Sequence, residues 1–285
     1  MTVSVVIPAY RAETFIARAV SSVLAQTLQD FEIVIVSDDG KDYIAILDMQ
    51  GICDSRIRCV STGGTRTGIS HARNCALDAA NHRIIVSLDA DDELLPDHLK
   101  RMREAAMAYG VAISQVDFVD QDNGAKLSNR AKPYAEGLLP LEDAFLVCLH
   151  TYAPVAFDRQ KIGHRWNEAV PLLEDAVFLA QCCDIAGSVW YGPEPTYRYY
   201  HRKDSQCNAT DAAARFMEAG SIILALLHNK KIMIGNPHIH DVLQAFIEKN
   251  NRLEMAFAKA LAAGEARDYQ DFIAKNITLL HAPLI

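Results

Sequence analysis

The sequence predicts an α/β fold built on a mainly parallel, open β-sheet with helices on both faces. Short runs of apolar and β-branched residues alternate with segments whose apolar residues recur at helical spacing. The apolar runs lack polar alternation, which is typical of parallel strands that are buried on both faces. These runs occupy residues 3–8, 31–37, 56–60, 84–88 and 111–120.

Helical segments separate these expected strands. Apolar residues at helical spacing predict a helix within 13–26. A second helix is expected over 68–80, with Ser70 as a candidate N-cap, and a third over 96–109, where Pro96 suits a first helical turn. Strands and helices in this order indicate βαβ units.

The chain is expected to divide into an α/β domain and a helical extension. Residues 1–207 would form the domain, with a first half at 1–110 and a more irregular second half at 111–207. The second half is expected to hold helices at 141–150 and 174–184 and short strands near 188–191 and 196–200. Three helical patterns fill 208–285, and the middle one carries an apolar stripe of Val242, Phe246, Leu253 and Phe257. Such a stripe indicates core or a subunit contact, with a membrane or lipid-acceptor role as the alternative.

Composition excludes several classes of protein. The formal net charge is −8, and the acidic surplus lies within residues 1–207, so a role in coating nucleic acid or anionic lipid is not expected. The seven cysteines show no CxxC pair, which favours free thiols in a reducing cytosol. The first residues read as a strand rather than a signal peptide, and the longest apolar run is too short to cross a bilayer. We therefore expect a cytoplasmic protein, with peripheral contact at the inner face of the membrane left open.

An acidic cluster follows the fourth expected strand. Asp89-Ala90-Asp91-Asp92-Glu93 begins where the buried run of 84–88 ends. Two carboxylates two residues apart on a turning backbone can converge on one divalent cation, and Mg²⁺ or Mn²⁺ leaves positions open for phosphate oxygens. The alternative is an ordinary set of acids favoured by the dipole of the following helix. For Asp89 to Asp92 the buried strand before them favours metal binding.

A second polar turn, Asp38-Asp39-Gly40, ends the second expected strand. Its carboxylates could accept hydrogen bonds from a base or from ribose hydroxyls, although an Asp-Gly pair is also a common turn. Because ligands bind at the carboxyl ends of strands in open α/β sheets, we expect both polar turns at one edge.

Four segments together resemble the family 2 nucleotide-sugar glycosyltransferases, which have the GT-A fold. They are VSVVIPAY, AVSSVLAQTLQDFEIVIVSDDG, GISHARNCALDAA and IIVSLDADDELLPDHL, and they occur in the order of the family over about the first hundred residues. The resemblance implies that residues 1–207 are a GT-A catalytic domain, with a nucleotide-binding half at 1–110 and an acceptor-binding and catalytic half at 111–207. The protein would be an enzyme that takes a sugar from a nucleoside-diphosphate sugar, with UDP the expected nucleotide. A saccharide or lipid-linked saccharide would be the acceptor, as in polysaccharide biosynthesis.

The resemblance also implies roles for individual residues. Asp38 and Asp39 would hold the base, in a pocket lined by Pro8, Tyr10 and Glu13. Arg73 would face the base or the diphosphate. Asp89 would contact the ribose, and Ala90 would belong to the same nucleotide-sugar site. Asp91 would bind Mn²⁺ or Mg²⁺, with Asp89 as a second ligand and His201 as a further alternative.

Two later segments match the family as well. PLLEDAVFLAQC (171–182) carries the Glu-Asp motif of the family at the start of a helix. Displacement at the anomeric carbon with inversion needs a base for the acceptor hydroxyl, and we assign it to Asp175, with Glu174 orienting the site. YRYYHRKDSQCNA (197–209) resembles the segment that closes over the diphosphate, where His201, Arg202 and Ser205 would meet developing negative charge.

Two departures from the family and three rival functions stay open. Arg11 stands where the family usually has Asn, and Lys41 follows the Asp-Gly turn where it usually has Ser or Thr. The rivals are a sugar-phosphate nucleotidyltransferase, suggested by GGTRTG at 63–68, a haloacid-dehalogenase-type phosphatase, and a catalytically silent nucleotide-sugar-binding protein. A homodimer through the C-terminal helices is a further expectation.

Overall fold

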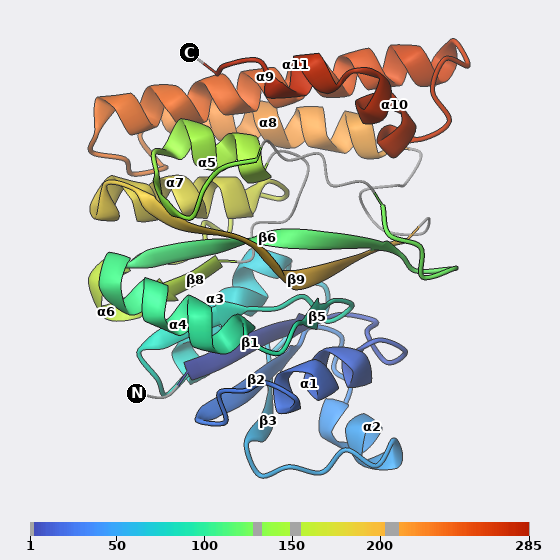
Figure 1. The fold of residues 1–285 in the computed structure, drawn as a ribbon, viewed down its shortest axis with the longest axis vertical. Helices are drawn as coiled ribbons and strands as arrows, with labels where there is room; N and C mark the ends of the chain where they lie inside the picture. The colour runs from blue at the N-terminus through green and yellow to red at the C-terminus, as the bar shows by residue number, and fades with distance from the viewer. Residues whose placement is uncertain (1–2, 128–132, 149–154, 203–210, 285) are drawn as a thin grey trace.

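The computed structural model describes residues 3–127, 133–148, 155–202 and 211–284. Within these ranges one nine-stranded mixed sheet forms the centre of the molecule, with the strand order β3-β2-β1-β4-β8-β6-β9-β5 and β7 paired to β9 (Figure 1). The strands are β1 (Val3–Ala9), β2 (Phe31–Ser37), β3 (Ile57–Ser61), β4 (Ile84–Ser87), β5 (Glu93–Leu94), β6 (Val111–Asp120), β7 (Gly137–Leu139), β8 (Val155–Asp158) and β9 (Val189–His201).

The first half of the sheet is parallel, as predicted. β1 pairs in parallel with β2 and β4, and β2 with β3. Adjacent residues of each strand face opposite cores: Val6 lies in one apolar cluster, whereas Val5 and Ile7 lie in the other. Both faces are therefore covered, which explains why the sequence shows apolar runs without alternation.

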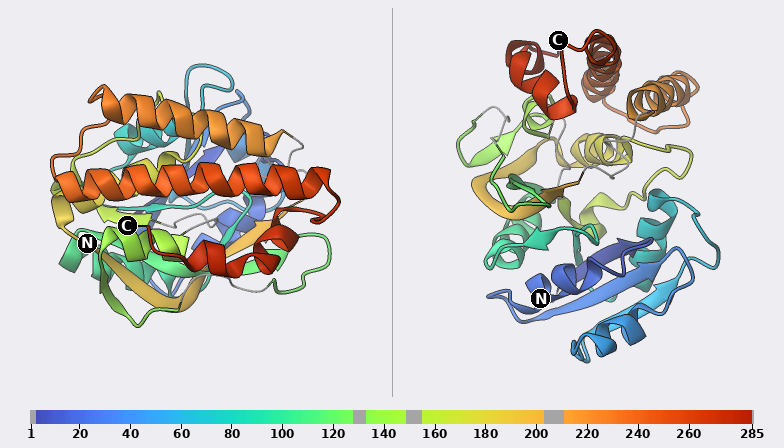
Figure 2. Two further views of the ribbon diagram at one scale, coloured as in Figure 1. Left: turned by 90° about the horizontal axis from the view of Figure 1, so that it is seen from above. Right: turned by 90° about the vertical axis from the view of Figure 1, so that its right-hand side faces the viewer.

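Helices cover the two faces (Figures 1 and 2). The core on one face takes side chains from α1 (Ile16–Leu24), α2 (Tyr43–Met49) and α4 (His98–Tyr109). The core on the other face takes them from α3 (Ile69–Ala79), α5 (Leu141–Cys148), α7 (Glu174–Ala186) and the C-terminal helices, and the short α6 (Arg159–Ile162) follows β8. The fold class predicted from the sequence is confirmed.

The second half of the sheet is mixed. β8 runs antiparallel between β4 and β6, and β9 runs parallel to β6. β8 was not predicted from the sequence, and β9 is one long strand where two short strands were predicted. Its register with β6 shifts around Gln115, opposite the segment that contains Pro193 and Pro195, because proline cannot donate to a strand ladder. Two reversals of direction bring the end of β9 to the same edge as the ends of β1, β2 and β4.

The C-terminal helices extend the core of the second half. α8 (Ala212–His228) and α9 (Pro237–Ala262) lie side by side above α5 and α7, followed by α10 (Tyr269–Lys275) and α11 (Ile277–His281) (Figure 2). The predicted stripe on α9 is buried: Val242, Phe246, Leu253 and Phe257 are each at most 9% exposed. Phe246 stacks on Phe145 of α5 with ring centroids 4.2 Å apart. The stripe is therefore intramolecular core.

Ser70 is not the N-cap of α3. The cap position is Gly68, whose φ of +109° is accessible to glycine, and Ser70 is buried in the first turn of the helix. Among the described residues no helix combines the length and the apolar character that a membrane span requires.

Candidate active site

A cavity of about 780 Å³ opens at the carboxyl edge of the sheet. Residues from the ends of β1, β2, β4 and β9 and from the starts of α3 and α7 line it, so segments far apart in the sequence meet there. Of the residues predicted for the site, those that line the cavity are Pro8, Tyr10, Asp38, Arg73, Asp89, Ala90, Asp91, Glu174, Asp175, His201 and Arg202. Ser205 lies outside the described residues.

Arg73 joins two of the predicted acids. Its Nη1 donates a 2.6 Å hydrogen bond to Glu174 Oε1, and its Nη2 lies 3.1 Å from Asp89 Oδ1. The Arg73 side chain is only 1% exposed. Burial raises the pKa of Asp89 to about 6, even though the charge of Arg73 lowers it. These contacts identify Arg73 as a positioning residue, so its predicted contact with a base or a diphosphate stays a prediction.

In the acidic turn after β4, Asp91 and Asp92 point in different directions. Asp91 faces the cavity, where Arg202 Nη2 donates to its Oδ2 at 2.7 Å. Asp92 points into the protein, where it accepts hydrogen bonds from the Tyr197 hydroxyl at 2.7 Å and the Tyr200 amide at 2.9 Å. Burial raises the pKa of Asp92 well above its ordinary value. The inclusion of Asp92 in the metal-binding cluster was therefore wrong, because its carboxyl group fixes the turn to β9.

Asp175 lies in the first turn of α7, after a strained residue. Leu173 has a φ of +61°, a left-handed conformation that leucine rarely adopts. The Ala176 amide donates to Asp175 Oδ1 at 2.8 Å. Burial, reinforced by the neighbouring charge of Glu174, raises the pKa of Asp175 to about 7, against the lowering effect of Arg73. A carboxylate with such a pKa can accept a proton near neutral pH.

Asp38 fixes the loop between β3 and α3. Its Oδ1 accepts hydrogen bonds from the Thr62 hydroxyl at 2.9 Å and the Thr67 hydroxyl at 2.6 Å, and its Oδ2 accepts one from the Gly68 amide at 3.2 Å. The carboxylate that was expected to hold a base therefore organises the loop that forms one wall of the cavity. The GGTRTG stretch lies in this loop after β3, and not after β1 as a nucleotidyltransferase would require.

Asp39 and Glu13 do not line the cavity, in contrast to the prediction. Asp39 accepts from the Arg11 amide at 2.8 Å and the Tyr43 hydroxyl at 3.1 Å, and Glu13 pairs with Lys41. Burial raises the pKa of Asp39, but these hydrogen bonds outweigh it and hold the pKa below its ordinary value. The sequence could not separate Asp38 from Asp39, because adjacent side chains at a strand end point in different directions.

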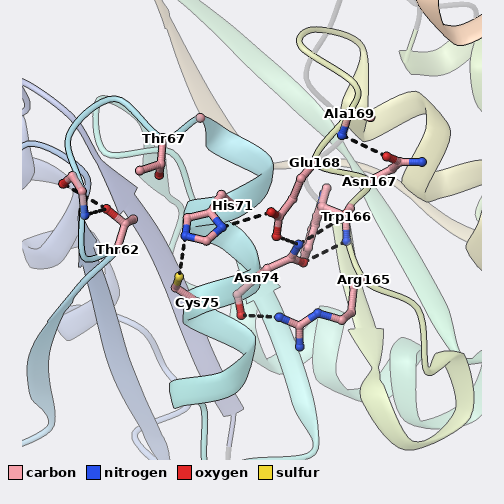
Figure 3. Close-up of polar contacts among 12 residues, drawn as sticks. Thr62, Thr67, His71, Asn74, Cys75, Arg165, Trp166, Asn167, Glu168 and Ala169 are labelled. Carbon is pink, nitrogen blue, oxygen red and sulfur yellow. Dashed lines mark hydrogen bonds and ion pairs between the residues drawn. The ribbon is translucent and has the colours of Figure 1, made fainter.

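The segment that leads to α7 is fixed to α3 by polar contacts (Figure 3). Asn74 Nδ2 donates to the Trp166 carbonyl at 2.9 Å and to Glu168 Oε1 at 2.7 Å. His71 Nδ1 lies 3.1 Å from Glu168 Oε2, and this contact raises the pKa of His71. His71 and Glu168 both line the cavity. Neither residue was predicted from the sequence, because the two partners lie 97 positions apart.

The cavity offers only part of a metal-binding site. Over the described ranges no three His, Cys, Asp or Glu side chains gather closely enough to hold an ion. Asp91 is 30% exposed and offers oxygen, the donor that Mg²⁺ and Mn²⁺ prefer. The site thus fits such an ion in part, with the remaining positions left to substrate oxygens.

The cavity also reaches the C-terminal helices, for which the sequence offered a lipid-acceptor role only as an alternative. Its wall there includes side chains of α8, α9 and α10, namely Ala212, Arg215, Phe216, Phe246, Asn250, Glu254, Phe257 and Tyr269. The sequence signal that could have indicated this wall is the pair of polar residues, Asn250 and Glu254, within the apolar face of α9.

The fold and the residues gathered at the strand ends define a glycosyltransferase of the GT-A type. The family model "Glycosyl transferase family 2" matches residues 4–161, and the chain belongs to this family. This confirms the family predicted from the sequence.

Two curated relatives and one solved structure illustrate the similarity. The succinoglycan biosynthesis protein ExoO of Rhizobium meliloti (strain 1021) is 31% identical over 216 residues, which cover 71% of this chain and 62% of ExoO. The Escherichia coli protein WfgD, a UDP-Glc:alpha-D-GlcNAc-diphosphoundecaprenol beta-1,3-glucosyltransferase, is 37% identical over 98 residues, covering 34% of this chain and 38% of WfgD. The matched region thus spans less than two thirds of either relative.

The solved structure is that of residues 1–349 of S. aureus TarS in complex with UDP-GlcNAc. It superimposes with a TM-score of 0.66 at 17% sequence identity and covers 88% of this chain and 72% of that one. At this identity the similarity supports the fold alone.

Proposed function

We propose that the chain transfers a sugar from a UDP-sugar to a hydroxyl group of a saccharide or lipid-linked saccharide, with inversion at the anomeric carbon. The observation that carries this proposal is that Asp91 and Asp175, 84 positions apart by their numbers, line one cavity at the carboxyl edge of the sheet. The names of WfgD and of the TarS complex, which include UDP-Glc and UDP-GlcNAc, support the choice of nucleotide.

In this proposal Asp175 is the general base. Direct displacement needs a group that takes the proton of the acceptor hydroxyl as the new bond forms. Asp175 suits this role because burial and Glu174 raise its pKa to about 7, so that it is both ionised in a large fraction and basic enough at neutral pH. Glu174, held by Arg73, orients the start of α7.

Asp91, with Asp89 as the second candidate ligand, would hold Mn²⁺ or Mg²⁺ together with the diphosphate oxygens. Such an ion supplies Lewis-acid stabilisation of the departing diphosphate. Arg202 and His201 line the same part of the cavity and provide cationic or hydrogen-bonding groups for that charge. Arg202 also lies over the Phe15 ring, 4.5 Å from its centroid, which orients the guanidinium beside Asp91.

Product analysis with UDP-glucose, UDP-GlcNAc and UDP-galactose in the presence of Mn²⁺ tests the proposal. We expect release of UDP from at least one donor, and loss of this release in Asp91→Ala. Phosphate from a sugar monoester, or pyrophosphate from a nucleotide and a sugar phosphate, would instead support the rival phosphatase or nucleotidyltransferase. Tight donor binding without turnover for any acceptor would support the silent binding protein. Peripheral membrane contact and homodimer formation stay predictions.

A further inference from the structure

The C-terminal helices form one wall of the cavity. Phe246, Asn250, Glu254 and Phe257 of α9 line it together with Phe216 of α8 and Tyr269 of α10. Spacings of four, four and three residues place the α9 side chains on one face of the helix. One continuous cavity therefore joins Asp91 and Asp175 to a wall that combines aromatic rings with an amide and a carboxyl group.

The two polar residues of this wall are buried. Asn250 is 3% exposed and Glu254 is 5% exposed. The Nδ2 atom of Asn250 has no hydrogen-bond partner among the described residues, although it is a donor removed from bulk solvent. Burial of an unpaired donor costs free energy. Because Nδ2 has almost no accessible surface, the Asn250 side chain would have to rotate to meet an acceptor group in the cavity, and that rotation would recover the missing hydrogen bond.

Lys249, also on α9, is a buried polar residue with a structural role. Lys249 is also buried, but its Nζ donates to the Leu280 carbonyl at 2.8 Å and to the Ala282 carbonyl, which ties the end of the chain to α9. Glu254 is bonded by Tyr269, yet burial still raises its pKa to about 7. Asn250 and Glu254 differ from Lys249 because both line the cavity, and the Nδ2 atom of Asn250 has no hydrogen-bond partner among the described residues.

We propose that Asn250 and Glu254 bind hydroxyl groups of the acceptor saccharide, while Phe216 and Tyr269 pack against the apolar face of its sugar ring. Aromatic rings beside a few buried polar groups are the common composition of a ligand site. The inference rests on the proposed function, since Asp175 lines the same cavity and would receive the proton of the reactive hydroxyl. The C-terminal helices would then complete the active site by selecting the acceptor.

Saccharide titrations of the full chain test this assignment. The probes are the p-nitrophenyl β-glucoside, β-galactoside, α-mannoside and α-N-acetylglucosaminide, titrated with saturating UDP and diamagnetic Mg²⁺ and followed by ligand-observed NMR. We expect at least one glycoside to bind the unaltered chain, and its dissociation constant to rise at least tenfold in Asn250→Leu and in Glu254→Gln. Glu248→Gln is the matched control, because Glu248 lies on the same helix outside the cavity wall and bonds Gln244.

Two further measurements separate this inference from the proposed function. Calorimetric titration with UDP and Mn²⁺ should give the same affinity in all three variants as in the unaltered chain. If UDP binds but no glycoside does, or if glycoside affinity is equal in all variants, the acceptor assignment is wrong while the proposed function stands. If UDP does not bind, the proposed function fails, and the same glycoside titrations without nucleotide still decide the role of Asn250 and Glu254. Asn250→Leu and Glu254→Gln are independent, so either one suffices if the other does not fold.

Discussion

Arg73 donates a 2.6 Å hydrogen bond to Glu174, which lies 101 positions later in the chain. This contact joins α3, which connects β3 to β4, to the first turn of α7. The same turn of α7 carries Asp175. The Arg73 side chain is 1% and the Glu174 side chain 10% exposed, so the pair is shielded from solvent. The position of the proposed base therefore depends on a buried cation from α3.

Arg73→Met tests the structural weight of this cation. Removing one partner of a buried ion pair leaves the other charges uncompensated, which typically costs about 3–5 kcal/mol. We expect a loss of unfolding free energy of this order, measured by urea denaturation at pH 7. Lys126→Met is the control, because the Lys126 side chain is 75% exposed. A loss below about 1 kcal/mol, the range of surface pairs, would contradict the role assigned to Arg73.

Asp175→Asn should retain donor binding and lose sugar transfer, because the amide cannot accept the proton. Transfer by the unaltered chain requires the ionised carboxylate, so kcat/KM should rise as the pH passes about 7. Rate measurements from pH 5 to 9 check the profile, and calorimetry with UDP checks binding. Normal turnover by Asp175→Asn would show that another group is the base.

The same substitution should alter stability with pH. A carboxyl group whose pKa is raised on folding favours the folded state when it is protonated, and this advantage is lost as the pH rises through the folded pKa of about 7. Asparagine resembles the protonated form at every pH. We therefore expect Asp175→Asn to be more stable than the unaltered chain at pH 8 and nearly equal at pH 4. Thermal denaturation at the two pH values measures this, and an equal difference at both would argue against the raised pKa.

Glu174→Gln should lower the pKa of Asp175. After burial, the negative charge of Glu174 is the largest cause of the raised Asp175 pKa. Removing that charge also leaves more of the positive charge of Arg73 to stabilise ionised Asp175, which lowers the pKa further. The acidic limb of the pH–rate profile should shift to lower pH. Asp184→Asn, near the other end of α7, is the control and should leave the limb in place. If the acidic limb of the Glu174→Gln profile is unchanged, the protonation of Asp175 does not control the rate.

Asp91→Ala should weaken metal-dependent nucleotide binding. Asp91 is the carboxylate of the turn after β4 that lines the cavity and is partly exposed, so its loss removes the best-placed oxygen ligand. Titration of UDP with and without Mn²⁺ should show that the metal enhances affinity in the unaltered chain and much less in the variant. Glu104→Gln, on the exposed surface of α4, serves as the matched control. Equal metal enhancement in Asp91→Ala and Glu104→Gln would refute the ligand role.

Arg11→Asn addresses the departure from the usual family residue. Arg11 has a φ of +53°, a conformation that asparagine tolerates better than arginine. Its amide donates to Asp39, so the backbone geometry is required whatever the side chain. We expect Arg11→Asn to raise the unfolding free energy by about 0.5–1 kcal/mol, whereas Arg11→Ala, which keeps a Cβ without the tolerance of asparagine, should not. Denaturant midpoints of both variants measure the effect.

The sequence by itself determined the parallel half of the sheet. The apolar runs at β1, β2 and β4 are continuous because each strand is buried on both faces. The acids that follow β2 and β4 stand out in the sequence because they interrupt these apolar runs. The helix that begins at Glu174 was found in the same way. These signals are local, since each depends on the burial of a few neighbouring residues.

Only the tertiary structure decided which side chains share the cavity. It separated Asp38 from Asp39 and directed Asp92 into the fold, and it inserted β8 between β4 and β6. It also placed Asn250 and Glu254 of a distant helix in the wall of the same cavity. The physical reason is that long-range packing fixes the direction of each side chain, whereas spacing along the chain records only the local secondary structure.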